Sequence, residues 1–72
     1  MRLYDQVAQL RRLDALIRRG ATGSPDELAR KLSVSRASVF RYLDELRAFG
    51  APVYYNKQRR SYCYKGTFSL EI

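Results

Sequence analysis

The stretch SPDELARKLSVSRASVFRYLDELRAFG, residues 24–50, decides the fold because it contains the signals that start and stop two helices. Ser24 can cap the first of these helices, and Pro25 suits the first helical position. Glu27 stands three residues after Ser24, where a capping box requires it. The sequence SVS at 33–35 then interrupts the pattern, so the first predicted helix is short.

The second helix of this stretch is predicted over residues 36–49. Ser35 is its N-cap, Gly50 suits a left-handed stop, and Pro52 lies just beyond. The inward apolar positions recur at helical spacing and are Val39, Leu43 and Leu46. Two helices joined by a break of about three residues are typical of a helix-turn-helix motif.

A longer helix is predicted before this motif, over about residues 3–19. Gly20, followed by Gly23, ends its apolar pattern. The apolar stripe consists of Leu3, Val7, Leu10, Leu13 and Ile17. Leu16 lies off this stripe, so it is either a single exposed leucine or part of a contact with a partner.

After Pro52 the period changes to two, which is typical of β-strands. The segments VYYNK and SYCYK are rich in aromatic and β-branched residues, and the polar NKQRR between them predicts the loop of a hairpin over about residues 53–65. Tyr54 and Cys63 fall on one face of this hairpin. The residues expected to face the helices are Val53, Tyr55, Tyr62 and Tyr64.

The last segment, TFSLEI at 67–72, alternates Phe68, Leu70 and Ile72 with polar residues. It is an extended segment that either adds a short C-terminal strand or packs elsewhere. These elements together predict an α+β fold of three helices followed by a two-stranded hairpin. Residues 1–72 are expected to form a single domain, because no linker, repeat or low-complexity segment interrupts them.

The composition favours an anionic partner and argues against catalysis. Fourteen Lys and Arg against seven Asp and Glu give a formal charge of +7, which suits nucleic acid or an acidic surface. The absence of histidine excludes Ser-His and Cys-His pairs, and one cysteine cannot build a zinc site. We therefore expect no enzyme, no metal, no cofactor and no small-molecule ligand.

Nothing in the sequence has the pattern of a membrane span or a secretory signal. A single cysteine also allows no internal disulfide, which agrees with a reducing compartment. The expected location is therefore the cytoplasm, without membrane association.

Residues 24–64 resemble the winged helix-turn-helix domain that opens biotin-repressor-like and WYL-domain bacterial regulators. The matching positions are Ala29, Val39, RYLDEL at 41–46, Gly50 and the two-stranded wing that follows. Ser33 departs from the pattern, because a glycine is common there in the turn. Those relatives usually continue into an effector-sensing domain, so no ligand-sensing function is inferred from the resemblance.

The resemblance implies that the helix at 36–49 reads DNA, and the helical geometry supports this. At 100° per residue, the outward positions are Ala37, Arg41, Asp44 and Ala48, with Phe40 and Arg47 on one flank and Ser38 and Glu45 on the other. Arg41 can pair with guanine or, alternatively, with Asp44 or Glu45 on its own helix. Ala37 can approach a thymine methyl, and Ser38 can donate to a base or a phosphate.

Arg36, just inside this helix, is a predicted phosphate contact. Phe40 either packs against the base of the wing or contacts a sugar or thymine. The wing tip, residues 57–60, is a basic loop that either grips phosphates, enters the minor groove or is simply solvated. The complete predicted DNA-binding set is Ser35, Arg36, Ala37, Ser38, Phe40, Arg41, Lys57, Gln58, Arg59 and Arg60.

The function that follows is sequence-specific binding of double-stranded DNA by a bacterial-type transcriptional regulator. The helix at 36–49 is expected in the major groove and the wing at 56–61 on the backbone or in the minor groove. Two alternatives stay open, an excisionase-like architectural factor and a protein-interaction module that docks an acidic partner. A homodimer or DNA-driven pairing is expected, held by the first helix or by the segment FSLEI.

Overall fold

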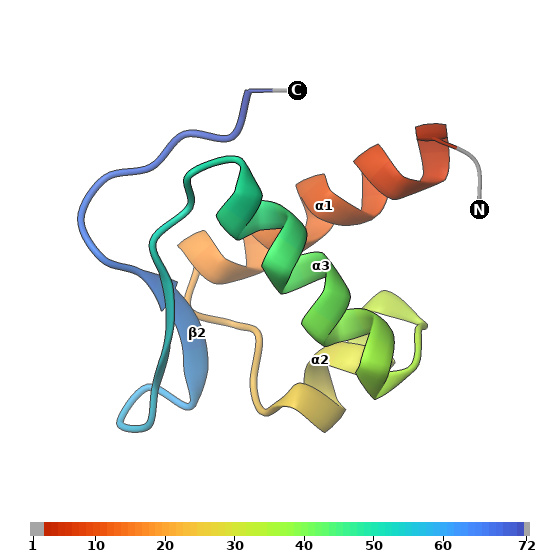
Figure 1. The fold of residues 1–72 in the computed structure, drawn as a ribbon. Coiled ribbons are helices and arrows are strands. Elements are labelled where there is room, and N and C mark those ends of the chain that lie inside the picture. The colour runs from red at the N-terminus through yellow and green to blue at the C-terminus, as the bar shows by residue number, and fades with distance from the viewer. Residues whose placement is uncertain (1–2, 72) are drawn as a thin grey trace.

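The computed structural model describes residues 3–71. Three helices are followed by one antiparallel hairpin, which confirms the predicted α+β winged helix-turn-helix architecture (Figure 1). The elements in chain order are α1 (Leu3–Arg18), α2 (Pro25–Leu32), α3 (Arg36–Ala48), β1 (Val53–Asn56) and β2 (Ser61–Tyr64). No helix in this described range is long and apolar enough to cross a bilayer.

The helix starts are built as the capping residues predict. The Ser24 hydroxyl accepts the Glu27 backbone N–H at 3.2 Å, and a Glu27 carboxylate oxygen accepts the Ser24 N–H at 3.3 Å, which completes the capping box. At the start of α3 the Ser35 hydroxyl accepts the Ser38 N–H at 3.1 Å. Gly50 follows α3 with a φ of 95°, a left-handed conformation that glycine adopts without strain.

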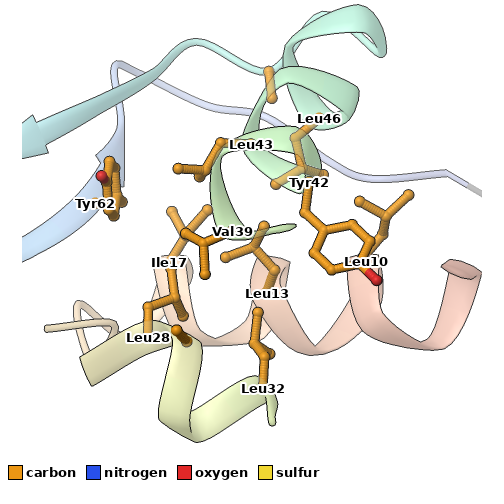
Figure 2. Close-up of a cluster of buried hydrophobic side chains, with 12 residues drawn as sticks. Leu10, Leu13, Ile17, Leu28, Leu32, Val39, Tyr42, Leu43, Leu46 and Tyr62 are labelled. Atoms are coloured by element: carbon orange, nitrogen blue, oxygen red, sulfur yellow. The ribbon is translucent and has the colours of Figure 1, made fainter. Parts of the chain in front are cut away.

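The core lies between the three helices and the inner face of β2 (Figure 2). Its largest side chains are Leu10, Leu13 and Ile17 of α1, Leu28 and Leu32 of α2, Val39, Tyr42, Leu43 and Leu46 of α3, and Tyr62 of β2. Tyr42 is fully buried, although the sequence pattern did not assign it to the inward face. It completes the i, i+3, i+4, i+7 spacing of a core-facing stripe, and Figure 2 shows its ring beside Leu10.

The hairpin pairs in the register expected for a tight wing, from Val53 opposite Tyr64 to Asn56 opposite Ser61. The predicted division into a covered and an open face is wrong at two positions. Tyr55 is 37% exposed, and Cys63 is only 5% exposed. Cys63 is covered because the end of α1 and residues 66–68 lie over its side of β2.

The C-terminal segment packs against the helices and forms no third strand within residues 67–71. The Phe68 ring contacts the Tyr64 ring at a centroid distance of 5.0 Å. Arg18 donates to the Phe68 carbonyl at 3.1 Å, so a side chain of α1 uses a backbone group that a strand ladder would need. The optional C-terminal strand is therefore not formed, and Ile72 lies outside the described residues.

A polar cluster joins this segment and β2 to α1. The Tyr64 hydroxyl donates to Asp14 at 2.7 Å, and Arg18 pairs with the same carboxylate at 3.0 Å. Burial, together with this hydrogen bond to Asp14, raises the pKa of the Tyr64 phenol well above its usual range. The phenol thus stays protonated and remains a donor at physiological pH.

Two buried hydroxyls attach the wing to the loop between α1 and α2. Thr22 and Ser61 are both fully buried, and their hydroxyl oxygens are 3.1 Å apart. The Thr22 N–H donates to the Ser61 hydroxyl at 3.2 Å, and the Tyr62 N–H donates to the Thr22 hydroxyl at 2.8 Å. This Thr22–Ser61 contact satisfies buried polar groups on both sides and sets the orientation of β2 relative to the helices.

Candidate nucleic-acid interface

The outward face of α3 is exposed as the helical geometry predicts. Val39, Leu43 and Leu46 point into the core, which leaves the opposite side of the helix in solvent (Figure 2). The exposed residues on that side are Ala37, Arg41, Asp44 and Ala48. The two alanines are small enough to let this face enter a major groove, Arg41 adds a strong hydrogen-bond donor, and Asp44 adds one negative charge.

Arg41 makes no ion pair within residues 3–71. Asp44, which could have paired with it, instead binds Arg47 at 3.1 Å. The Arg41 guanidinium lies over the ring of Tyr42, 5.5 Å from the centroid. The intrahelical pairing that the sequence left open is therefore absent at Arg41, and its donors face solvent.

Arg36 and Phe40 form one exposed unit near the start of α3. The Arg36 guanidinium lies 5.7 Å from the centre of the Phe40 ring, and Phe40 is 43% exposed. Arg36 also approaches Asp26 of α2 at 3.7 Å, a contact between two exposed side chains that water and salt weaken. The cation thus stays close to the surface of both helices of the helix-turn-helix motif.

The two serines at the start of α3 have different hydrogen-bonding roles. The Ser35 hydroxyl accepts the backbone N–H of Ser38 and donates its own hydrogen to the Ser38 hydroxyl oxygen at 3.0 Å. Ser35 is therefore occupied as the helix cap. Because Ser38 acts as the acceptor in that pair, its own hydroxyl hydrogen can be donated outward.

The wing tip is an ordered turn. The Asn56 side chain accepts the backbone N–H groups of Gln58 and Arg59 at 3.0 and 3.1 Å. Arg60 closes the turn with a φ of 53°. All four residues between the strands are exposed, and no acidic side chain pairs with them within the described part of the chain: Lys57, Gln58, Arg59 and Arg60.

Arg59 differs from its neighbours in where its side chain lies. A Cβ atom built on Gly20 would come within 2.9 Å of the Arg59 guanidinium carbon. The side chain thus folds back over the end of α1, while Lys57 and Arg60 remain at the exposed turn. The predicted residues therefore fall into two groups, one near the start of α3 and one at the wing tip, and Arg59 lies between the wing and the end of α1.

The family comparison matches this geometry. The model of a helix-turn-helix family, HTH_11 (HTH domain), matches residues 8–64, from α1 to the end of β2. This chain belongs to the HTH domain family. Membership identifies a DNA-binding regulator of transcription in general terms and points to a non-enzymatic role. No curated protein matches the chain, and no solved structure does.

Tyr55 is a surface residue of this HTH domain that sequence reasoning missed. It lies on β1, which packs against α3, and its ring meets Tyr62 edge-on at 5.0 Å. Its hydroxyl has no hydrogen-bond partner within residues 3–71. The strand period assigned Tyr55 to the covered face, and only the placement of β1 beside α3 reveals a half-exposed phenol next to that helix.

Proposed function

We propose that this HTH domain binds double-stranded DNA in a sequence-specific way as a bacterial-type transcriptional regulator. In this proposal α3 enters the major groove, and the wing at 56–61 contacts the backbone or the minor groove. The observation that carries the proposal is Arg41, an exposed arginine in the middle of the outward face of α3 that forms no ion pair with any residue from 3 to 71. The net charge of +7 supports an anionic partner.

Each residue of α3 has a role set by its chemistry. Arg41 provides two parallel N–H donors for the O6 and N7 acceptors of a guanine. Ala37 is small enough to let the helix approach closely and touch a thymine methyl. The outward hydroxyl hydrogen of Ser38 suits a base acceptor or a phosphate, while Ser35 holds the helix start in place.

The remaining residues hold the DNA without reading it. Arg36 is suited to a phosphate beside the groove, with Phe40 packed under its guanidinium and against the sugar edge. At the wing tip, Lys57, Gln58 and Arg60 are suited to the next phosphate strand or to the minor groove. Arg59 reaches the backbone only by leaving Gly20, so we assign it mainly to the position of the wing.

Within the HTH family, Ala29, Val39 and Gly50 favour the winged domains of biotin-repressor-like and WYL-type regulators. Ser33 supports this assignment in an indirect way. It adopts the left-handed conformation, with a φ of 56°, that the more common glycine would take at this point of the turn.

Replacement of Arg41 tests sequence reading. A preferred duplex is first selected from random DNA with the purified chain. Arg41→Ala should then cost about 1–3 kcal/mol on that duplex and relax the preference at one base position. Arg19→Ala removes the same charge from α1 and should leave the preference unchanged. If the Arg41→Ala chain binds the selected duplex as tightly as the parent chain does, the proposal is contradicted.

Replacement of wing residues tests backbone contact. Lys57→Ala and Arg60→Ala should weaken all duplexes alike, and each lost phosphate contact should reduce the slope of log K against log salt by about 0.9. If the wing enters the minor groove, the loss is larger with A·T-rich flanks than with G·C-rich ones. Unchanged affinity for both wing variants and for Arg41→Ala at every salt concentration would favour the protein-docking alternative.

A further inference from the structure

A second surface of the molecule has the composition of a binding site and shares no residue with the DNA-binding surface. It is an open cleft of about 470 Å³ between α1 and α2, in the size range of small-ligand and side-chain sites. None of its lining residues comes from α3 or the wing. The lining residues are Arg12, Ala15, Leu16, Arg19, Ala21 and Lys31.

The rim of this cleft is positively charged, and its lining contains no acidic side chain. Arg12 donates to the Lys31 carbonyl at 2.8 Å, and the Lys31 ammonium donates to the Ala21 carbonyl at 2.5 Å. Both cations are therefore held at the cleft by neutral carbonyl groups, and the carboxylate within electrostatic range of Lys31, that of Glu27, does not line the cleft. The Arg19 side chain has no hydrogen bond or ion pair within residues 3–71. Three positive charges thus surround one concavity.

The floor of the cleft is apolar. We use the word floor for the three apolar lining residues, Ala15, Leu16 and Ala21, of which Leu16 also packs against the core. This explains why Leu16 lies off the inward stripe of α1, a position that the sequence left open. An apolar floor inside a ring of cations fits a ligand that carries both negative charge and an apolar group.

We propose that this cleft docks a short acidic peptide segment of a partner protein, with one apolar side chain on the floor and carboxylates against Arg12, Arg19 and Lys31. Charge complementarity favours this occupant, and the apolar floor favours it over a nucleic-acid backbone, which offers no aliphatic group to bury. The outward face of α3 points away from α1, which packs behind it (Figure 1). The chain can therefore hold DNA and the peptide segment together.

The binding mode is tested with the isotope-labelled full chain and a synthetic probe, the capped peptide EDELEDE, at about 0.15 M salt to limit general charge attraction. We expect chemical-shift changes confined to the cleft-lining residues. The peptide EDESEDE, which lacks the apolar anchor, should bind about tenfold more weakly. The peptide QNQLQNQ, which lacks the carboxylates, should not bind. Shift changes spread over α3 and the wing, or no binding up to about 5 mM peptide, would overturn the proposal.

Matched variants separate this site from the DNA-binding surface. Arg19→Glu and Ala15→Glu should each weaken peptide binding at least about tenfold and change affinity for DNA less than about twofold. Arg41→Glu makes the same change of charge as Arg19→Glu. It should weaken DNA binding and leave the affinity for the peptide nearly unchanged. If Arg41→Glu weakens peptide binding as much as Arg19→Glu does, the peptide is attracted only by the general positive charge of the chain. If Arg19→Glu weakens DNA binding as strongly as peptide binding, the cleft contacts the DNA backbone, and either result overturns the proposal. The peptide measurements do not depend on whether Arg41 reads DNA.

Discussion

Ser33 ends α2 in the left-handed conformation, with a φ of 56°. Its N–H donates to the Arg30 carbonyl at 3.1 Å, and the Val34 N–H donates to the Ala29 carbonyl at 3.0 Å, so the turn satisfies two helix-end carbonyls. A residue with a Cβ is strained by about 1–2 kcal/mol there, whereas glycine is not. Glycine also raises the entropy of the unfolded chain, which offsets about 0.4–1 kcal/mol of that gain.

Ser33→Gly should therefore stabilise the fold by about 0.5–1 kcal/mol. The measurement is the urea concentration at the midpoint of unfolding. The slope of the unfolding free energy against urea concentration should stay unchanged, because that shows that the area exposed on unfolding is the same. Ser69→Gly is the control, since Ser69 is exposed and does not have a positive φ. A Ser33→Gly chain that unfolds at lower urea than the parent would contradict the expected strain.

Glu27 makes stability depend on pH at the start of α2. Its pKa lies below the ordinary value of 4.5, mainly because its carboxylate accepts the backbone N–H of Ser24 and also interacts with the Ser24 hydroxyl. A lowered folded-state pKa means that the stabilisation is fully present above the unfolded value and is lost as the pH falls through the folded value.

Glu27→Gln keeps an acceptor for the Ser24 N–H that does not titrate. From about pH 5 down to pH 3, the parent should therefore lose stability more steeply than the Glu27→Gln chain. Thermal unfolding of both chains across this interval measures the difference. If the stability of the two chains falls equally with pH, the Glu27 carboxylate contributes nothing to the acid sensitivity of the fold.

At the scale of elements, the Thr22–Ser61 contact is one of several links between the wing and the helical part, together with the Tyr64–Asp14 hydrogen bond and the burial of Tyr62. Thr22→Val keeps the volume of the side chain but removes the hydroxyl that accepts the Tyr62 N–H. A buried donor is then left without a partner, and we expect a loss of about 1–3 kcal/mol in the free energy of unfolding. Thr67→Val, at an exposed threonine, should stay within about 0.5 kcal/mol of the parent. Equal stability of the two variants would show that the hydroxyl contact does not anchor β2.

The bounds of the helices and the outward face of α3 could be predicted from the sequence. Ser24, Pro25 and Glu27 act on neighbouring backbone groups, so local pattern located the helices to within about one residue of their observed ends. Helical spacing likewise located the outward face of α3, including Arg41.

The missed features depend on contacts between elements. Cys63 is buried because the C-terminal segment and α1 cover its side of β2. Tyr55 is exposed because β1 lies at the edge of α3, and Arg59 folds back because Gly20 leaves room for its guanidinium. A period of two assigns strand faces but does not tell which of them a neighbouring element will cover.

At the scale of the whole molecule, one winged-helix domain is expected to contact only a short DNA site. A single module buries about 600–1,000 Å² on DNA, so useful specificity usually needs two copies on related half-sites. We expect two copies on one selected duplex, and sedimentation of the chain with and without that duplex measures this. A complex of one copy per duplex at every protein concentration would contradict the expected pairing.

The Thr22–Ser61 contact also has a consequence for the order of folding. Its partners are 39 residues apart in the chain, whereas each helix and the hairpin close over short distances. Closing this contact costs loop-closure entropy that the local contacts within each helix and within the hairpin do not cost. Opening of the wing therefore requires loss of this contact together with withdrawal of Tyr62 from the core and of Tyr64 from Asp14. We expect amide hydrogen exchange at Tyr62, whose N–H donates to Thr22, to report how often the wing opens. In the proposed complex, that frequency would limit how long the wing stays bound to DNA.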